Sequence, residues 1–317
     1  MECLHLGHAV ICNADGEIVE SWGDPAALIY PRSSCKMIQA LPLIESGAAD
    51  AFGLTTEQLA LSCASHIASD IHTTRVSRWL ADLGLGDEDL RCGPQEPGDR
   101  DARDALIRTG DQPCQIHNNC SGKHSGFLTY TKHIGAGPEY VELDHPLQKA
   151  IRAAFEETTE EQSPCFGIDG CSAPNFATSI VGLARSMAKF AEAGSGNGVR
   201  EKAMNRMVSA MMTHPELVSG EGKACTELMR AAKGKAAIKG GADGVYTAIL
   251  PDLGLGVALK IVDGAIAPRE GAIAALLIHL GILEAGDPVA GRWINRKMTN
   301  RRGLETGILK TAPGFPV

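Results

Sequence analysis

Residues 31–40 read PRSSCKMIQA, and they place Ser33 and Lys36 three residues apart at the predicted start of a helix. Side chains at this spacing share one helix face and lie within hydrogen-bonding reach. A lysine can take the proton of a serine only in its neutral form, which requires burial or a nearby positive charge. The stretch therefore predicts that Ser33 is an activated nucleophile.

The same spacing recurs at Ser186 and Lys189, but there it lies inside a predicted helix, where a solvated lysine is expected. Ser33 differs because it follows Pro31, which places it at a helix N-terminus whose backbone N–H groups can stabilise an oxyanion. The spacing alone leaves a second interpretation open, in which Ser33 only caps the helix. Other residues are needed to distinguish a nucleophile from a cap.

The overall composition is that of a soluble globular protein. The chain has 317 residues, of which 44% are hydrophobic and 21% charged, enough for one large domain or two packed ones. A formal net charge of -8 argues against a nucleic-acid partner. No apolar run approaches the roughly 18–20 residues of a membrane span, and the first residues show no signal-peptide pattern. We therefore expect a cytoplasmic protein that does not associate with membranes.

Apolar periodicity predicts strands at the two ends of the chain and helices between them. Residues 7–22 alternate around an Asn/Asp/Gly turn and predict a β-hairpin. Further strands are predicted at 236–241, 244–250 and 255–262. Helices are predicted at 33–46, 55–65, 70–83, 121–133, 145–159, 173–193, 199–213, 223–233 and 270–283, and residues 91–115 are expected to form a loop.

This order of elements predicts an α+β fold. One antiparallel sheet would collect segments 1–50 and 236–317, and the mainly helical segment 51–235 would be inserted as a second domain. The active site would lie at the seam between the two, where clefts usually form.

Three further side chains have the chemistry to assist Ser33. Ser65 and His66 end a predicted helix: Ser65 offers a second hydroxyl, and His66 is either a base or a partner of the helix dipole. Lys239 begins the strand after the helical segment, in the sequence Lys239-Gly240-Gly241. Serine β-lactamases carry a Lys-Thr-Gly motif at this place as well as a Ser-x-x-Lys nucleophile. Gly240 replaces the threonine, so the match is partial.

Ten cysteines are scattered along the chain without a Cys-x-x-Cys pair, and we expect most of them to be buried rather than paired in disulfides. Cys120 and Cys171 each lie in a polar turn before a predicted helix, where a thiolate is favoured. Two such cysteines facing each other would make half of a metal site. Asp169 lies in the second of these turns and is suited to bind an α-ammonium group, although a structural Asx turn is the alternative.

Seven ordered segments together resemble the rhizobial-type, thermolabile L-asparaginase family. They lie at 32–36, 62–66, 92–94, 118–126, 145–148, 167–174 and 239–245, and they span nearly the whole chain. The resemblance implies a fold like those of β-lactamases and glutaminases, a homodimer, and the hydrolysis of L-asparagine to L-aspartate and ammonia.

The resemblance also implies roles for the residues above. Ser33 would be the nucleophile with Lys36 as its partner, and Ser65 and Lys239 would form a second Ser–Lys pair. Arg32 and Asp169 would bind the carboxylate and ammonium groups of the substrate; alternatively, the charge of Arg32 would favour the neutral form of Lys36. We also expect His66 and Asn119 to contact the substrate.

The family's zinc ligands correspond to Cys120, Lys123 and Cys171, with a water molecule completing the shell. Lysine is an unusual ligand because it must lose its proton to offer a lone pair.

Two other functions remain open from the residues alone. The first is a serine hydrolase of the β-lactamase or penicillin-binding type. The absence of a Ser-x-Asn motif after Ser65, the glycine at 240 and the lack of a secretion signal argue against it. The second is a zinc-bound protein that binds an amino acid without catalysis.

Overall fold

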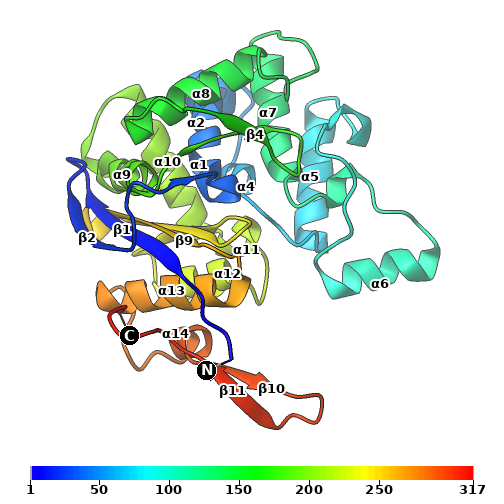
Figure 1. The fold of residues 1–317 in the computed structure, drawn as a ribbon. Coiled ribbons are helices and arrows are strands. Elements are labelled where there is room, and N and C mark those ends of the chain that lie inside the picture. Colours follow the sequence, from blue (N-terminus) through cyan, green and yellow to red (C-terminus); the bar gives the residue numbers. More distant parts are fainter. Residues whose placement is uncertain (1, 317) are drawn as a thin grey trace.

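A five-stranded antiparallel sheet forms the centre of the computed structural model, which describes residues 2–316 (Figure 1). Its strand order is β2-β1-β9-β8-β7. The N-terminal strands β1 (Gly7–Asn13) and β2 (Ile18–Trp22) form the predicted hairpin. The C-terminal strands β7 (Ala237–Gly240), β8 (Val245–Leu250) and β9 (Leu255–Ile261) complete the sheet. The two ends of the chain are joined where β1 pairs with β9, with Ala9 opposite Leu259.

The other elements are short strands and helices. The strands are β3 (Leu28–Ile29), β4 (Phe166–Ile168), β5 (Pro174–Phe176), β6 (Thr178–Ser179), β10 (Arg296–Thr299) and β11 (Glu305–Leu309). The α-helices are α1 (Lys36–Gln39), α2 (Leu41–Glu45), α3 (Ala48–Ala51), α4 (Thr56–Ser62), α5 (Asp70–Asp82), α6 (Arg100–Thr109), α7 (Ser121–His133), α8 (Pro146–Thr159), α9 (Ile180–Glu192), α10 (Val199–Thr213), α11 (Pro215–Val218), α12 (Ala224–Ala231), α13 (Ile266–His279) and α14 (Pro288–Ile294). The 3-10 helices are η1 (Arg32–Cys35), η2 (Asp87–Asp89), η3 (Gln115–His117), η4 (Ala193–Ser195) and η5 (Pro251–Leu253).

Helices cover both faces of the sheet. Helix α9 packs on β9, β1 and β8, and α13 packs on β8 and β9 from the opposite side (Figure 1). Because both faces are covered, β8 is buried along its whole length and β9 along most of it. The fold class is the predicted α+β arrangement. The division into domains at residues 50 and 235 stays a prediction, and α9, from the middle of the chain, lies directly on the sheet.

Several predicted boundaries are wrong, each for an identifiable reason. The helix predicted at 173–193 begins at Ile180, because Pro174–Phe176 and Thr178–Ser179 pair with β4 and β3 as strands. Residues 100–109 form α6 rather than a loop, capped by the Asp99 side chain, which accepts from Ala102 N at 2.9 Å. This helix buries none of its residues and projects from the body of the molecule (Figure 1). Its low content of apolar residues explains why it was predicted to be a loop.

The helix predicted at 33–46 is divided into η1, α1 and α2. Neither serine caps it: the Ser34 hydroxyl donates to the Pro31 carbonyl at 2.7 Å, and no side chain caps η1. Pro42 lies in the first turn of α2, where a backbone N–H would have no partner within the helix, so the N–H that proline lacks is not needed. Gly47 ends α2 with a φ of 82°, a conformation that favours glycine.

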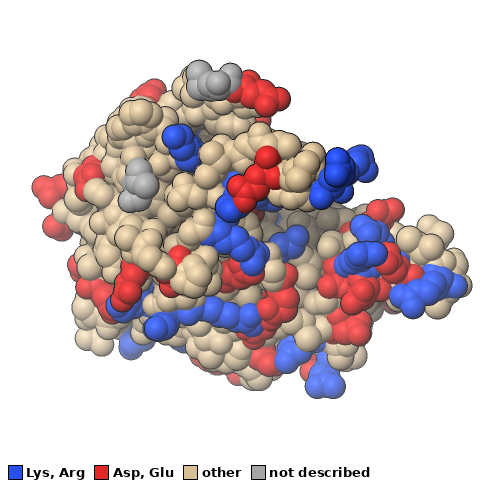
Figure 2. Space-filling view, turned by 90° about the horizontal axis from the view of Figure 1, so that it is seen from below, with Lys and Arg blue, Asp and Glu red and all other residues tan. Residues whose placement is uncertain are grey.

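Charged residues of both signs are interspersed over the face shown in Figure 2. The arm that projects from this face also carries acidic and basic residues side by side (Figure 2). No helix within residues 2–316 is both long and apolar enough to cross a bilayer.

Substituting Gly256 on β9 tests the close packing of the sheet on α9. A Cβ at this position would lie 2.1 Å from Ala188 N and 2.3 Å from Ala184 O, which are backbone atoms of α9. We therefore expect Gly256→Ala to lower the free energy of unfolding by about 1–3 kcal/mol, measured by urea denaturation.

Gly291→Ala is the matched control, because Gly291 lies inside α14 and no atom lies within 4 Å of its added Cβ. Alanine there should stabilise the protein by about 0.5–1 kcal/mol through its higher helix propensity. Equal effects of the two substitutions would contradict the close packing described here.

Candidate active site

The segment that carries Ser33 is fixed to the edge of the central sheet. The buried Thr247 hydroxyl on β8 donates to the Ser34 carbonyl at 3.0 Å and lies 3.3 Å from the Lys239 carbonyl on β7. A Cβ on Gly241 would lie 2.7 Å from the Pro31 carbonyl oxygen. Position 241 therefore requires a glycine, because the chain after β7 lies against the serine segment there. This close approach explains the second glycine of the Lys-Gly-Gly sequence.

Two lysines converge on the hydroxyl of Ser65. Lys36 Nζ lies 3.1 Å from Ser65 Oγ, and Lys239 Nζ lies 2.8 Å from it. Both lysine side chains are buried, and Ser65 is half-buried. The residues come from three distant parts of the chain: α1, the end of α4 and β7. A serine between two buried amines is the arrangement expected for proton transfer.

Burial and, to a smaller extent, the positive charge of Lys36 together lower the pKa of Lys239 to about 8. Within residues 2–316, the Lys239 amine hydrogen-bonds to Ser65 Oγ and to the Gly240 carbonyl, each at 2.8 Å. Near neutral pH, a lysine of this kind is partly deprotonated. Lys239 can therefore act as a base toward the Ser65 hydroxyl.

The structure does not join Ser33 to Lys36 by a hydrogen bond. The Lys36 ammonium directs its three donors to the Ala64 carbonyl, to Ser65 Oγ and, at 3.1 Å, to Cys120 Sγ. All its donors are thus used away from Ser33. The Ser33 side chain is half-buried, and among residues 2–316 it makes no hydrogen bond.

Cys120 and Lys123, which are three residues apart, lie beside this network together with the distant Cys171. Lys123 Nζ lies 3.0 Å from Cys171 Sγ, and all three side chains are at most 3% exposed. A hydrogen bond from Cys120 and the charge of Lys123 hold the pKa of Cys171 well below its usual value, against the opposing effect of burial. Burial lowers the pKa of Lys123, but the Cys171 and Cys120 sulfurs raise it more, so that it lies above its usual value. The pair is therefore a thiolate with an ammonium.

These residues also fit a metal ion by their chemistry. Thiolate sulfur is a preferred ligand of zinc. Among residues 2–316, no three His, Cys, Asp or Glu side chains group closely enough to hold a metal, so a third protein donor would have to be the Lys123 amine. A further polar atom, Nε2 of the buried His124, has no hydrogen-bond partner.

Arg32 forms an ion pair with Asp169 at the edge of the site. Arg32 Nε lies 2.9 Å from Asp169 Oδ1, and an Nη atom of the same guanidinium contacts the carboxylate of Asp243. Sequence reasoning did not identify Asp243, although it follows the Lys239 motif by only four residues. Arg32 and Asp243 both have a φ of 53°, which is uncommon for residues other than glycine. Such conformations concentrate at functional sites.

Both ring nitrogens of His66 are hydrogen-bonded to other residues of the protein. Its Nε2 lies 2.9 Å from Ser121 Oγ, and its Nδ1 accepts from Ala68 N at 3.1 Å. Burial, the nearby His72 and the charge of Lys36 hold its pKa well below the usual value, so the ring is neutral. Both ring nitrogens are therefore occupied away from any substrate. The Asn119 backbone carbonyl accepts from His66 N at 3.1 Å, and Asn119 is half-buried.

The second Ser-x-x-Lys copy has none of these contacts. The buried Ser186 hydroxyl has no hydrogen-bond partner, and Lys189 pairs with Glu160 at 2.7 Å on the surface. Its lysine thus serves a surface ion pair, as the sequence predicts.

Comparison with known proteins gives a family and a fold. The family model described as L-asparaginase II matches residues 1–311. No curated protein sequence matches the chain.

Among solved structures, the glutaminase Mglu in its tris and glutamate form has a TM-score of 0.51 at 13% identity. The alignment covers 89% of this chain and 61% of Mglu, so this chain spans about three fifths of that protein's length. Another structure of Mglu has a TM-score of 0.50 at 14% identity and covers 94% of this chain and 72% of Mglu. A putative β-lactamase from Bacteroides dorei DSM 17855 aligns with 80% of this chain and 84% of its own, at 14% identity and a TM-score of 0.45. The likeness to Mglu agrees with the predicted fold class.

Proposed function

Because the chain belongs to the L-asparaginase II family, we propose that it hydrolyses the side-chain amide of L-asparagine to L-aspartate and ammonia through an acyl-enzyme intermediate. The family makes it an amidohydrolase of the asparaginase type. The observation that supports a serine mechanism best is the convergence of two lysines on Ser65: Lys239, and Lys36, which lies three residues after Ser33.

In the proposed mechanism, Ser33 Oγ attacks the amide carbon of the substrate side chain. The serine proton passes to a neutral lysine, and backbone N–H groups beside the nucleophile stabilise the oxyanion. The carbon–nitrogen bond then breaks, and the lysine returns its proton to the leaving nitrogen, which departs as ammonia. Water next attacks the aspartyl ester by the same proton transfers, which releases L-aspartate and restores the Ser33 hydroxyl.

Ser65 is suited to carry protons between the lysines and the nucleophile. Its hydroxyl touches both amines, and one hydroxyl can accept a proton from one neighbour while donating its own to another. Hydrogen bonds to a nucleophile are often loose in the free enzyme and tighten when substrate binds. The lack of a direct Ser33–Lys36 contact is therefore compatible with Ser33 as the nucleophile.

A second assignment within the same reaction makes Ser65 the nucleophile. It is supported by the 2.8 Å contact of Ser65 with Lys239, the lysine whose pKa is about 8. Ser33 would then assist from the side of the substrate. The two assignments differ in which serine carries the aspartyl ester.

Alanine substitution of each serine distinguishes these assignments. We expect Ser33→Ala to reduce kcat/KM for L-asparagine by at least about 10⁴-fold, because no nucleophile remains. Ser65→Ala should reduce it by about 10²–10⁴-fold, the usual loss for a proton-transfer group. Ammonia release measures turnover, and mass spectrometry of acid-quenched enzyme locates the ester.

Ser186→Ala is the matched control, since it removes the serine of the other Ser-x-x-Lys copy and should leave turnover unchanged. Near-wild-type ammonia release by Ser33→Ala would exclude Ser33. An ester on the peptide that contains Ser65 would establish the second assignment.

The pKa of Lys239 predicts how the rate depends on pH. A base must be neutral to accept a proton, and the neutral fraction of a lysine with a pKa of about 8 increases as the pH rises through 8. We expect kcat/KM to rise about tenfold per pH unit below 8 and to level off above it. A flat profile, or a midpoint near the usual lysine value of 10.5, would contradict a role for Lys239 as base.

We also propose that Cys120, Lys123 and Cys171 hold a zinc ion. When bound, zinc would act as a Lewis acid that polarises a substrate carbonyl, or it would fix the site's shape. The residues themselves hold Cys120 Sγ against Lys36 Nζ and Cys171 Sγ against Lys123 Nζ. Lys123 must lose its proton to become a ligand, so metal binding should weaken as the pH falls.

Elemental analysis of the purified protein tests this metal site. We expect about one zinc per chain in the wild type and loss of most of it in Cys171→Ser, because a thiolate ligand is removed. Cys12→Ser is the control, since Cys12 is buried in β1, away from the site. Equal zinc in wild type and Cys171→Ser, or none in either, would leave these cysteines as structural residues.

Two further expectations about this protein remain predictions: that it forms a homodimer and that it is cytoplasmic. The roles of His66 and Asn119 in substrate binding also remain predictions. For His66 the structure supports positioning instead, since both ring nitrogens already bind protein atoms.

A further inference from the structure

One arginine at the edge of the site is held by two carboxylates of very different exposure. Arg32 contacts Asp169, whose side chain is 13% exposed, and Asp243, whose side chain is 64% exposed. An arginine has five N–H donors, which is enough for two carboxylates at once. The difference in exposure suggests that the two aspartates have different roles.

Asp169 is fixed in place by its own turn. Its Oδ1 accepts from Gly170 N at 2.8 Å, and its backbone carbonyl accepts from Ser172 N at 2.8 Å. It therefore serves as a permanent partner that orients the Arg32 guanidinium.

Asp243 differs because its carboxylate depends on Arg32 alone. Within residues 2–316, no other group makes a hydrogen bond to that carboxylate. The backbone around it is firmly held, however: Lys260 donates to the Asp243 carbonyl, Arg269 donates to the Gly241 carbonyl, and Gly241 N donates to Val245 O at 2.9 Å. The side chain can thus leave Arg32 while the turn stays in place. Exposed ion pairs of this kind are weak.

The substrate proposed above carries the same chemical group as Asp243. The α-carboxylate of a free amino acid is a carboxylate on a tetrahedral carbon, and arginine binds such groups through paired N–H donors. The Asp243 turn also lies on the serine segment, since Gly241 packs against Pro31 and Ser34. A carboxylate bound to Arg32 at this position would hold the rest of the amino acid close to Ser33.

We propose that Asp243 is an internal counter-ion, which occupies the carboxylate subsite of Arg32 in the free enzyme and is displaced by the α-carboxylate of the substrate. This inference rests on the proposed function, whose substrate class it specifies. Asp243 is then a specificity-determining residue. A ligand must carry a carboxylate to take its place, and every such ligand must compete with it.

The test is Asp243→Asn, which removes the charge but keeps the shape of the side chain. Asparagine also tolerates the positive φ of this position, so the turn should fold. Because the binding-competent fraction of the free enzyme increases, we expect the dissociation constant for L-aspartate, measured by calorimetry, to fall about two- to sixfold. KM for L-asparagine should fall similarly, with kcat changed little.

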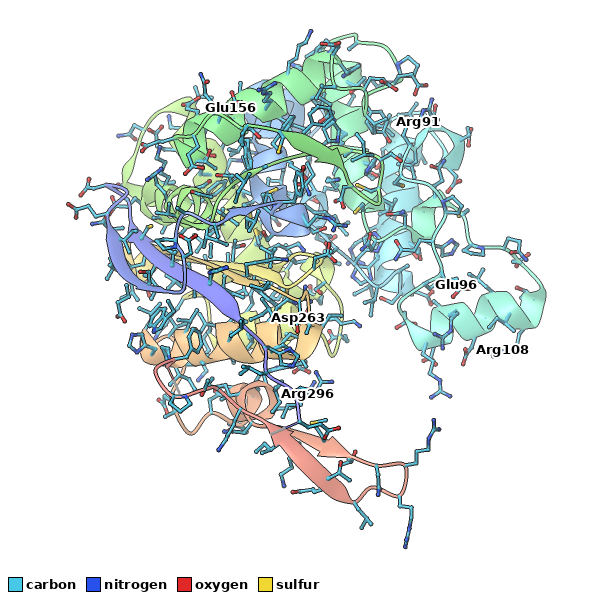
Figure 3. All side chains as sticks on the ribbon, in the orientation of Figure 1. Arg91, Glu96, Arg108, Glu156, Asp263 and Arg296 are labelled. Atoms are coloured by element: carbon cyan, nitrogen blue, oxygen red, sulfur yellow. The ribbon has the colours of Figure 1, made fainter. Side chains whose placement is uncertain are left out.

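Two comparisons make the result specific. Asp263→Asn, on the turn after β9 (labelled in Figure 3), removes a nearby exposed charge that pairs with His5 rather than Arg32, and it should not change aspartate affinity. The second uses 3-aminopropanamide, which is L-asparagine without its carboxylate. Asp243→Asn should give no gain in affinity for this compound.

Unchanged or weaker aspartate binding by Asp243→Asn would overturn the inference, and so would an equal gain for 3-aminopropanamide. Failure of wild type and variant alike to bind aspartate would also overturn it. The proposed function is judged separately, by whether the wild-type protein releases ammonia from L-asparagine. The two hypotheses can therefore fail independently.

Discussion

Two buried lysine amines, those of Lys36 and Lys239, both contact the hydroxyl of Ser65, and this arrangement depends on much of the surrounding structure. A buried ammonium is costly unless it is hydrogen-bonded, and two of them close together also repel each other. Here the cost is offset by the Ala64 and Gly240 carbonyls, the Cys120 sulfur and the shared Ser65 hydroxyl. The remaining penalty is expressed chemically, since burial and repulsion lower the pKa of Lys239 to about 8. Burial and repulsion therefore favour the neutral amine of Lys239, the form that the proposed mechanism uses as a base.

The scaffold holds this arrangement through contacts between segments that are distant in the chain. The first strand pairs with β9, which brings the N-terminal serine segment to the same sheet as Lys239. Thr247 links the backbone at Ser34 to the backbone at Lys239. Ser65 lies just after helix α4, in the mainly helical part of the chain. Helix α9 supports the sheet from behind, at a distance so short that Gly256 admits no side chain. Small changes in any of these contacts would displace the amines relative to the hydroxyl.

The charges around the site form two groups that differ in their exposure to solvent. On one side, Lys123 and Cys171 form a buried ammonium–thiolate pair. On the other, Arg32 joins Asp169 and Asp243 near the surface. The buried pair is shielded from solvent. Of the two ion pairs of Arg32, the one with Asp243 is the more exposed and therefore the weaker. The difference in exposure thus distinguishes the buried Lys123–Cys171 pair from the exposed Arg32–Asp243 pair.

The amino-acid sequence by itself determined the order of elements and the chemistry available. The hairpin at 7–22, the three C-terminal strands and most helices follow from local periodicity, because each buries one face along its own length. Local periodicity does not identify α6, which has no buried residue. It also does not identify the strands at Pro174–Phe176 and Thr178–Ser179, because these depend on partners elsewhere in the chain. The sequence also singled out Ser33, Ser65, Lys36 and Lys239. Only the tertiary structure decided how they pair: Lys36 reaches Ser65 rather than the neighbouring Ser33, and Arg32 acquires Asp243 as a second partner. The physical reason is that spacing along a helix fixes which residues can meet, whereas a buried amine binds whichever acceptors the fold places within its reach.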